Sequence, residues 1–459
     1  MGTEMKEEKK GKVGILKFWT WNFRTMSAGI QAVLIGYIVF YCTDVLELNA
    51  ALVATLLMAS KIFDGVTDIL AGYLVDKTHT RLGKARPYEF AIIGLWVATW
   101  AVFSVPTSLS TVAKCVWVVV AYTMAQSVFN TLLNANNTAY MVRAFNSQQT
   151  YVKLSSIGGL VTVAGVAVFN VVFPTMMANA GTDAGKWSHM ILMLAAPLAI
   201  IGILRFFFVP EKYDVDAGSA SVNFKEVITL LKTNKYIYFV ALVTLVAQII
   251  SGFGVSVYYF TYIVKNLSLM GIMSLFTVVA MLTMIAYPAM LKKMSVKNLI
   301  QLGCVFYIVA GLVLFLAKDN MALLATGNIL MGMGTLPISM MGPLLIIECA
   351  DYNEWCGRPR MEGTLGSING FANKIGSAIG TFICGVLMAA SGYVGSAGDV
   401  TVLPDSALMM IRLLYSLIPA AFFALVLVCL KFYTLDKKID GMRKENEERR
   451  QNAEVMEEV

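Results

Sequence analysis

Residues 210–235, PEKYDVDAGSASVNFKEVITLLKTNK, form a polar and charged stretch near the middle of the 459-residue chain. Long apolar runs fill the sequence on both sides of it. A membrane-spanning helix needs about 20 mostly apolar residues, and six such runs precede the stretch and six follow it. The sequence therefore predicts two bundles of six spanning helices, residues 1–209 and 236–433, joined by this linker and followed by a tail at 434–459.

The composition also indicates an all-α polytopic membrane protein. Hydrophobic residues make up 58% of the chain and charged residues 14%, against about 25% charged residues in ordinary soluble domains. The mean hydropathy is +0.69. Such a chain lacks the polar residues that cover a soluble domain and is too apolar for disorder. Seven scattered cysteines without a CxxC pair exclude a secreted disulfide scaffold, and two histidines are too few for a His-rich metal site.

The ends of the twelve expected spans follow from the turn residues. Pro87 opens the third span, Pro210 follows the sixth, and Lys318, Asp319 and Asn320 separate the ninth from the tenth. The spans are expected near residues 16–41, 48–75, 88–106, 112–141, 154–176, 188–209, 236–264, 267–291, 298–317, 321–348, 366–392 and 407–433.

The distribution of Lys and Arg predicts the orientation. With a cytoplasmic N-terminus, 27 of them fall in cytoplasmic segments and four in outer loops, as the positive-inside rule requires. Both termini are therefore expected in the cytoplasm, and the net charge of +7 reflects topology rather than nucleic-acid binding. No cleavable signal is expected, because the first span is too long for a signal h-region. The charged tail is expected to be a cytoplasmic helix or disordered.

Three ionisable residues interrupt the second span, in the run ASKIFDGVTD at 59–68. A charge inside a span costs about 2.5–3.5 kcal/mol on insertion scales and usually faces a cavity or a partner. Asp64 and Asp68 are one helical turn apart and share a face. Two carboxylates on one face favour a site for a small hard cation or a proton. The alternative is a structural ion pair between Lys61 and Asp64, which leaves Asp68 unexplained.

The eleventh span carries Asn369, Asn373 and Lys374. The two asparagines are one turn apart, and the lysine needs an anionic partner or ligand inside the membrane. Asp64 or Asp68 is a candidate partner. In the alternative interpretation, Lys374 only reaches a backbone carbonyl.

Amides and one arginine mark the fourth and first spans. Asn130, Asn134 and Asn137 have the spacing of a single helix face, and amides offer both donors and acceptors to a polyhydroxylated ligand. Amides also join helices across membranes, so this structural role stays open. Arg24 in the first span is a candidate ligand-binding cation or one more charge at the cytoplasmic interface.

Two clusters of acids and bases are candidates for gates that hold one conformer closed. Both are expected on the cytoplasmic side. The first follows the second span and the second precedes the eleventh. Their members are Asp76, Arg81, Lys84 and Arg86 in the first, and Asp351, Glu354, Arg360 and Glu362 in the second.

The sequence resembles the glycoside–pentoside–hexuronide:cation symporter family, to which the melibiose carrier belongs. The resemblance rests on YCTD at 41–44, KIFDGVTD at 61–68 with RLGKARP at 81–87, DYNEW at 351–355, and the spacing from Arg360 to Lys374. It covers residues 15 to 435. It implies a major facilitator fold and secondary active transport of a glycoside, driven by Na⁺, H⁺ or Li⁺. It also implies that Asp64 and Asp68 bind the cation and that Lys374 is the family's lysine of the eleventh helix.

The departures from the family pattern concern the sugar site. The position of a sugar-binding aspartate on the first helix is Ala28, and the acid of the fourth helix that sugar and cation share is Asn134. The aromatic positions beside the sugar are Thr138 and Ser339, and the arginine of the fifth helix is replaced near Lys153. Melibiose is therefore not the expected substrate, H⁺ stays open as the coupling ion, and Arg24 with Lys374 would tolerate an anionic sugar.

The leading hypothesis is a cation-coupled glycoside symporter of the inner membrane that works by alternating access as a monomer, without a cofactor beyond Na⁺ or H⁺. An alternative keeps the fold and carries an amphipathic lipid or steroid conjugate. An enzyme is not expected, because the sequence has no nucleophile–His pair, HExxH motif or phosphate loop. The proposed cation ligands are Asp64, Asp68 and Asn134. The proposed substrate ligands are Arg24, Asn130, Asn134, Thr138, Lys153, Ser339, Asn369, Asn373 and Lys374.

Overall fold

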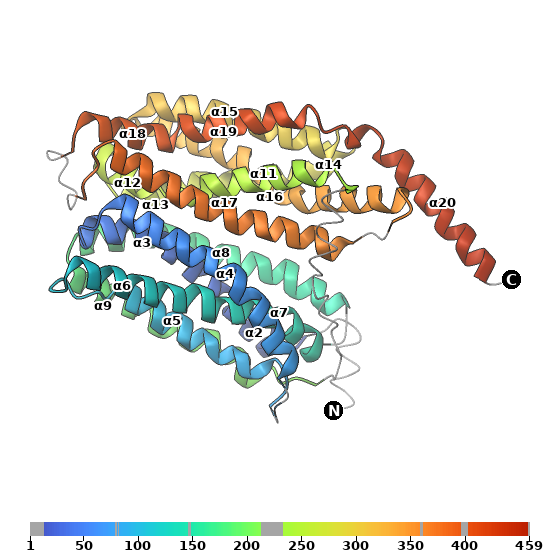
Figure 1. Cartoon of the computed structure of the whole chain (residues 1–459), viewed down its shortest axis with the longest axis horizontal. Helices are drawn as coiled ribbons and strands as arrows, with labels where there is room; N and C mark the ends of the chain where they lie inside the picture. Colours follow the sequence, from blue (N-terminus) through green and yellow to red (C-terminus); the bar gives the residue numbers. More distant parts are fainter. Residues whose placement is uncertain are drawn as a thin grey trace. The chain divides into compact units, whose positions relative to one another are not determined.

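The structure is a computed structural model that describes residues 13–457, apart from 79, 81, 146–147, 213–232, 359–360 and 396–402. Among these residues the first half forms six helical stretches: α2 with η1, α3 and η2 (Ile15–Leu34, Ile35–Tyr37, Ile38–Phe40, Tyr41–Val45); α4 (Ala50–Lys77); η3 with α5 (Arg86–Phe90, Ala91–Val102); α6 with η4 and α7 (Thr111–Thr123, Met124–Asn130, Thr131–Ala144); α8 (Gln148–Ala180); and α9 (Ala184–Phe208) (Figure 1).

The second half also forms six stretches within the described residues. They are α11 with α12 and η5 (Ile237–Gly252, Ser256–Tyr258, Tyr259–Ile263); α13 with η6 and α14 (Ser268–Val279, Ala280–Ala286, Tyr287–Leu291); α15 (Val296–Ala317); α16 (Met321–Trp355); α17 (Glu362–Ala390); and α18 with α19 (Asp405–Tyr415, Leu417–Leu430). The short η8 (Leu435–Lys437) and the helix α20 (Ile439–Glu457) follow. The twelve stretches agree with the twelve expected spans, and the tail is a helix.

Side-chain caps set several of these boundaries. The Asn320 side chain accepts hydrogen bonds from the backbone N–H groups of Ala322 and Leu323 and so starts α16. Asp183 caps α9 in the same way, and Pro87 lies in the first turn of η3. Such caps satisfy N–H groups that have no partner within the helix, which explains why the turn residues predicted the helix ends.

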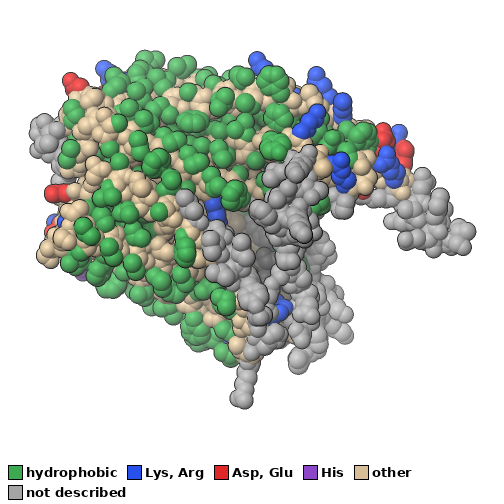
Figure 2. All heavy atoms as spheres, in the orientation of Figure 1, with side chains coloured by type: hydrophobic (Ala, Val, Ile, Leu, Met, Phe, Trp, Pro, Cys, Tyr) green, Lys and Arg blue, Asp and Glu red, His purple; other side chains and the backbone are tan. Residues whose placement is uncertain are grey.

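The helices have the length and surface of membrane spans. Nine of them in the described part of the chain are long and apolar enough to cross a membrane, and two shorter apolar segments are Ala50–Lys61 and Ser268–Met284. Large apolar side chains are exposed along them, such as Leu160 at 70% and Leu316 at 71%. Apolar side chains dominate the face drawn in Figure 2. An apolar surface of this extent favours contact with lipid over contact with water.

The chain divides into two compact units. Unit 1 comprises Met1–Ser219, Phe260–Ile272 and Phe382–Leu408, and unit 2 comprises Ala220–Tyr259, Met273–Thr381 and Met409–Val459. In unit 1, α2 packs against α8 and α9; in unit 2, α15 packs against α16 and α19, and α20 packs against α16. Two pieces of the second half thus belong to unit 1. The division into two bundles at residues 210–235 stays a prediction.

A buried carboxylate joins the two later pieces of unit 1 to its first helical stretch. Asp44 in η2 is 1% exposed. Its oxygens accept hydrogen bonds from the hydroxyls of Thr43 at 2.6 Å, of Tyr393 at 2.7 Å and of Tyr262. Three hydroxyl donors from three segments satisfy most of the acceptor capacity of one carboxylate. We call these four residues the Asp44 cluster.

Glycines bring α11 and α17 of unit 2 into close contact. A Cβ atom at Gly376 would lie 2.6 Å from the carbonyl oxygen of Leu245, and one at Gly252 would lie 2.5 Å from that of Ser377. The hydroxyl of Thr381 donates a hydrogen bond to the Gly252 carbonyl at 3.1 Å. Small residues let helix backbones approach closely inside membranes, so this glycine contact fixes which side chains of the two helices meet.

We expect alanine to have opposite effects at two glycines of α17. Gly376→Ala places a methyl group against the Leu245 carbonyl and should lower the unfolding temperature, at a cost of about 1–3 kcal/mol for overpacking. Gly370 has no atom within 4 Å of an added Cβ, so Gly370→Ala should leave the temperature unchanged or raise it, because alanine favours helix. Thermal unfolding of the purified protein in detergent measures both, and equal shifts would contradict the close contact.

Candidate functional site

The carboxylate of Asp64 lies against the π-helical stretch η4. The hydroxyl of Ser127, which is buried in η4, donates a hydrogen bond to this carboxylate. Lys61 stands one turn earlier on α4, is half-buried, and interacts electrostatically with Asp64. The hydroxyls of Ser60 and Thr123 are 2.7 Å apart and join α4 to α6 beside it. Asp64 is therefore a half-buried carboxylate of unit 1 with polar side chains of α4, α6 and η4 around it.

Polar side chains continue along η4 and α7 beyond Ser127. The Asn130 amide nitrogen donates to the Gln126 side-chain oxygen at 3.1 Å, and the Asn134 nitrogen donates to the Asn130 oxygen at 3.4 Å. The three amides form a ladder that ends at the exposed side chain of Asn134. Asn137 instead accepts a hydrogen bond from Arg205 at 3.0 Å. Of the three asparagines predicted on one face, Asn130 and Asn134 therefore belong to the ladder and Asn137 to a second network.

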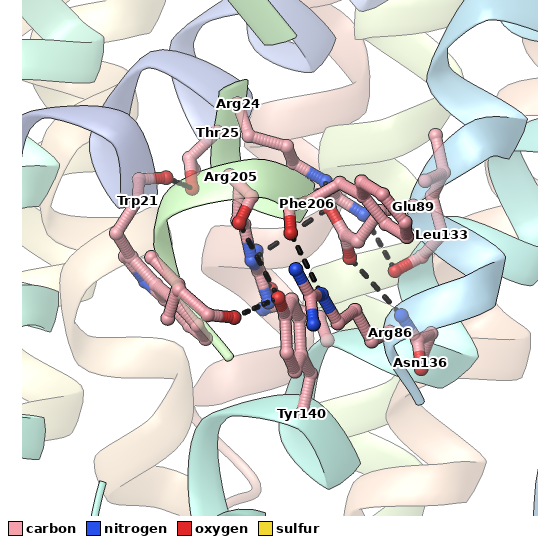
Figure 3. A network of polar contacts seen from close by, with 12 residues as sticks. Trp21, Arg24, Thr25, Arg86, Glu89, Leu133, Asn136, Tyr140, Arg205 and Phe206 are labelled. Atoms are coloured by element: carbon pink, nitrogen blue, oxygen red, sulfur yellow. Dashed lines mark hydrogen bonds and ion pairs between the residues drawn. The ribbon is translucent and has the colours of Figure 1, made fainter. Parts of the chain in front are cut away.

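That second network surrounds Glu89 (Figure 3). The Glu89 carboxylate lies 3.4 Å from the Nε atom of Arg24 and 3.6 Å from that of Arg205, and all three side chains are buried. Asn136 donates a hydrogen bond to the carboxylate at 3.0 Å. Arg24 also donates to the Leu133 carbonyl at 2.7 Å. The guanidinium of Arg24, a predicted substrate ligand, is thus engaged by groups of its own unit.

Aromatic rings complete the surroundings of Arg205. Its guanidinium lies 3.4 Å from the ring centroid of Trp21 and 4.5 Å from that of Tyr140. Cation–π contacts of this kind stabilise a desolvated guanidinium. We call Arg24, Glu89 and Arg205 the Glu89 triad. It links α2, η3 and α9 through charge.

A pocket lined by both polar and apolar side chains lies within unit 2. It has a volume of about 590 Å³, in the range of small-molecule sites. Phe253, Tyr307, Tyr415 and Phe423 contribute aromatic rings to its wall. Hydroxyls and amides form the rest of its polar lining, which comprises Thr244, Gln248, Ser251, Ser256, Thr335, Ser339, Asn369 and Asn373. Three of the predicted substrate ligands, Ser339, Asn369 and Asn373, are therefore brought together in one cavity.

Lys374 follows the pocket residue Asn373 on α17. Its side chain is exposed, and it does not belong to the described lining of the pocket. The side chains of five other predicted site residues lie outside the described part of the structure, as do Arg81 and Arg360 altogether. The five are Asp68, Asp76, Thr138, Lys153 and Glu362.

The described residues of the first predicted gate bind an acid that sequence reasoning missed. The carboxylate of Glu211 accepts hydrogen bonds from the backbone N–H groups of Lys84 at 3.0 Å, Ala85 at 2.7 Å and Arg86 at 2.5 Å. The side chain of Arg86 donates to the Phe206 carbonyl at 2.7 Å. Glu211 thus stabilises the conformation of the loop after α4.

The second predicted gate binds the tail helix. Asp351 forms an ion pair with Arg443 of α20 at 2.7 Å, and its carbonyl accepts a hydrogen bond from Asn446. The indole of Trp355 donates to Glu445 at 2.7 Å. Glu354, which follows on the same turn, is half-buried. The charges at the end of α16 therefore anchor the tail helix within unit 2.

Comparison with known sequences places the chain in a family. Residues 26–437 match the family described as MFS/sugar transport protein. The chain belongs to this family. It is 28% identical to the isoprimeverose transporter of Lactiplantibacillus pentosus, over 87% of this chain and 84% of the relative. It is 26% identical to the glucuronide carrier protein homolog of Escherichia coli K12, over 88% of each chain. The resemblance to the glycoside–pentoside–hexuronide:cation symporters is confirmed.

A solved structure supports the fold. The crystal structure of the nucleoside transporter NupG is similar to this chain with a TM-score of 0.65 and 14% sequence identity, over 91% of this chain and 98% of that one. At this identity the likeness concerns the fold alone. The predicted major facilitator fold is confirmed.

Sequence reasoning missed Glu89, Glu211, Thr244 and Gln248. Glu89 follows Pro87 at the start of a span. Acidic residues are common in the first turn of a helix, so its position alone does not indicate a buried ion pair. Thr244 and Gln248 are four residues apart on α11, the same spacing that identified Asn369 and Asn373. This spacing could have predicted a shared polar face on α11, but threonine is common inside spans and is therefore weak evidence for a site.

We expect Glu89→Gln to destabilise unit 1 strongly. The substitution keeps a hydrogen-bonding side chain but removes the negative charge that two buried guanidiniums share. Breaking a buried ion pair from one side costs about 3–5 kcal/mol. The amount of folded protein in membranes and its unfolding temperature should both fall. Glu447→Gln on the exposed face of α20 is the matched control, and the same stability in both variants would show that the triad contributes little.

Proposed function

We propose that the protein carries out cation-coupled symport of a glycoside across the cytoplasmic membrane. The observation that carries the proposal is the pocket of about 590 Å³ with hydroxyl and amide side chains in its lining, inside an apolar helical unit, in a chain of the MFS/sugar transport protein family. Hydroxyls and amides line the pocket, and they match the donors and acceptors of a sugar. The substrate crosses the membrane without chemical change.

The coupling cation binds at Asp64 and Asp68, with Asn134 as a further oxygen ligand. The half-buried position of Asp64 and the Ser127 hydroxyl beside it support this assignment, because carboxylate and hydroxyl oxygens suit Na⁺ and a carboxylate alone suits H⁺. Lys374 neutralises a carboxylate when the cation is absent.

Substrate hydroxyls bind to Asn369, Asn373 and Ser339 in the pocket, and to Asn130 and Asn134 on the amide ladder. Thr138 and Lys153 are further substrate ligands in this proposal. We assign Arg24 a structural role instead, because its buried guanidinium is engaged by the Glu89 carboxylate and the Leu133 carbonyl. We favour a sugar over a lipid or steroid conjugate, since the pocket is rich in hydroxyls and amides and the relatives bear the names of sugar carriers.

Transport proceeds by alternating access in a monomer whose termini both face the cytoplasm. In this scheme the Asp44 cluster closes the outer end of unit 1 while the inner end is open. This assignment is supported by the hydrogen bonds that three segments of the chain donate to the buried carboxylate of Asp44. The two predicted gates close the cytoplasmic end. The first comprises Asp76, Arg81, Lys84 and Arg86, and the second comprises Asp351, Glu354, Arg360 and Glu362.

Uptake into membrane vesicles tests the coupling. Isoprimeverose and a glucuronide are offered with imposed Na⁺ and H⁺ gradients separately. We expect one gradient to accelerate uptake of at least one sugar, and Asp64→Asn to abolish the acceleration, because the amide cannot bind a proton or balance the charge of a cation. Asp440→Asn on exposed α20 is the control. Gradient-driven uptake in Asp64→Asn equal to that of the parent would exclude Asp64 from the cation site.

The outer closure predicts a change in the reactivity of Cys42, which is fully buried beside the Asp44 cluster. Replacing both Tyr262 and Tyr393 by Phe removes two of the donors to Asp44, so the closure should open more often. Labelling of Cys42 by a membrane-impermeant maleimide added from outside should then be several times faster, as mass spectrometry measures. Tyr37→Phe, whose ring packs on Phe173, is the control. An unchanged labelling rate would argue against the closure.

A further inference from the structure

One hydrogen bond sets the orientation of an amide in the pocket of unit 2. The hydroxyl of Thr244 on α11 donates to the side-chain oxygen of Asn369 on α17 at 2.5 Å. Both residues line the pocket. The oxygen of the amide is thereby occupied, and its NH₂ group, with two donor hydrogens, is left for the cavity.

The backbones of α11 and α17 hold this pair in a fixed register. Gly376, seven residues after Asn369 on the same helix, packs against Leu245 and Gln248 of α11. Gln248 and Asn373 follow Thr244 and Asn369 by one turn each, so the same helix faces supply four polar side chains to the cavity. We call Thr244, Gln248, Asn369 and Asn373 the α11–α17 seam. A site built on packed helices keeps its donors in position before the ligand binds.

Aromatic rings form an apolar wall in the same pocket. The rings of Tyr307 and Phe423 have centroids 4.2 Å apart, and Tyr415 stacks on Tyr259 at 4.2 Å. The Tyr415 hydroxyl lies 3.4 Å from the side-chain oxygen of Asn328. These contacts fix the rings of the wall. A ligand with polar groups at its edge and C–H groups on its faces, as in a sugar ring, matches amide donors together with such a wall.

The described lining of the pocket contains no Asp, Glu, Lys, Arg or His. A carboxylate placed there would lose its water without gaining a cation, and burying an unpaired charge is costly. Of the two cations that suggested an anionic sugar, Arg24 is paired with Glu89 in unit 1. Lys374 has an exposed side chain outside the described lining. The chemistry of the pocket therefore favours an uncharged ligand.

We propose that the α11–α17 seam is the recognition site for a neutral glycosyl unit of the substrate, and that Thr244 is a positioning residue that presents the NH₂ group of Asn369 to a sugar oxygen. This inference rests on the proposed function, since it names the substrate class of the same transporter. It assigns a role to two residues of α11, Thr244 and Gln248, and it excludes a carboxylated sugar unit from this pocket.

The test compares transport kinetics in variants of the seam. The probes are isoprimeverose, a neutral disaccharide, and p-nitrophenyl β-D-glucuronide, which carries a carboxylate. We expect Thr244→Val, which keeps the shape but loses the donor, to raise the KM for isoprimeverose about fivefold with little change in maximal rate, the size of one net hydrogen bond. Thr244→Ser keeps the hydroxyl and should retain the KM of the parent.

Asn369→Asp gives a second measurement. The aspartate still accepts the hydrogen bond from Thr244, but it loses the NH₂ donors and adds a charge, so the KM for isoprimeverose should rise at least tenfold. The amount of each variant in the membrane and its unfolding temperature separate this effect from misfolding. Gly370→Ala on the same helix, where an added Cβ has no neighbour within 4 Å, is the control for α17.

The outcomes distinguish this inference from the proposed function. Parent protein that takes up neither probe under either gradient would overturn both. Gradient-driven uptake with the same KM in Thr244→Val and in the parent would overturn the role of Thr244 and leave symport standing. Preference of the parent for the glucuronide over isoprimeverose would overturn the neutral subsite alone. A raised KM in Thr244→Val that Thr244→Ser restores would support the inference.

Discussion

Charge burial is the constraint on which unit 1 depends. Among spanning helices, a carboxylate or guanidinium has no water to solvate it and must find partners within the protein. Glu89 meets this requirement with two arginines from helices that are far apart in sequence. One carboxylate serves two guanidiniums in this triad, and the shared contact fixes α2, η3 and α9 relative to one another. The amide ladder on η4 and α7 lies on a neighbouring part of the same frame, since Asn136 binds Glu89 and Asn137 binds Arg205.

The elements of the fold could be predicted from the sequence because local properties determine them. An apolar run of sufficient length forms a span wherever it lies, and residues such as Asn320 or Asp183 cap helices through neighbours two or three positions away. The amides of Asn369 and Asn373 were found by their spacing for the same reason. Partners across the fold could not be predicted. Nothing local distinguishes an Arg24 that meets Glu89 from one that meets a ligand or a lipid headgroup, and Thr244 is significant only because Gly376 brings α11 onto α17.

The two units use different chemistry for their polar groups. Unit 1 contains Asp64 and Lys61 on α4 and the Glu89 triad, all of them ionisable residues. The described lining of the unit 2 pocket is uncharged. Under the proposed assignments, the cation and the neutral sugar share only Asn134 as a ligand, and neither needs the charge of the other to bind. Coupling between them then has to arise from a conformational equilibrium that both ligands shift, because each stabilises a state by its own differential affinity.

Asp44 and Asp64 show how the surroundings decide what a carboxylate does. Both lie in or beside π-helical stretches of unit 1, and both accept hydrogen bonds from hydroxyl groups. Asp44 is 1% exposed and its acceptors are used by Thr43, Tyr262 and Tyr393, so an ion would have to displace three protein donors to reach it. Asp64 is half-buried, and the hydroxyl of Ser127 donates to its carboxylate. The same type of side chain thus has a structural role at Asp44 and a proposed role as an ion ligand at Asp64, and the two sites differ in how many hydroxyl donors surround the carboxylate.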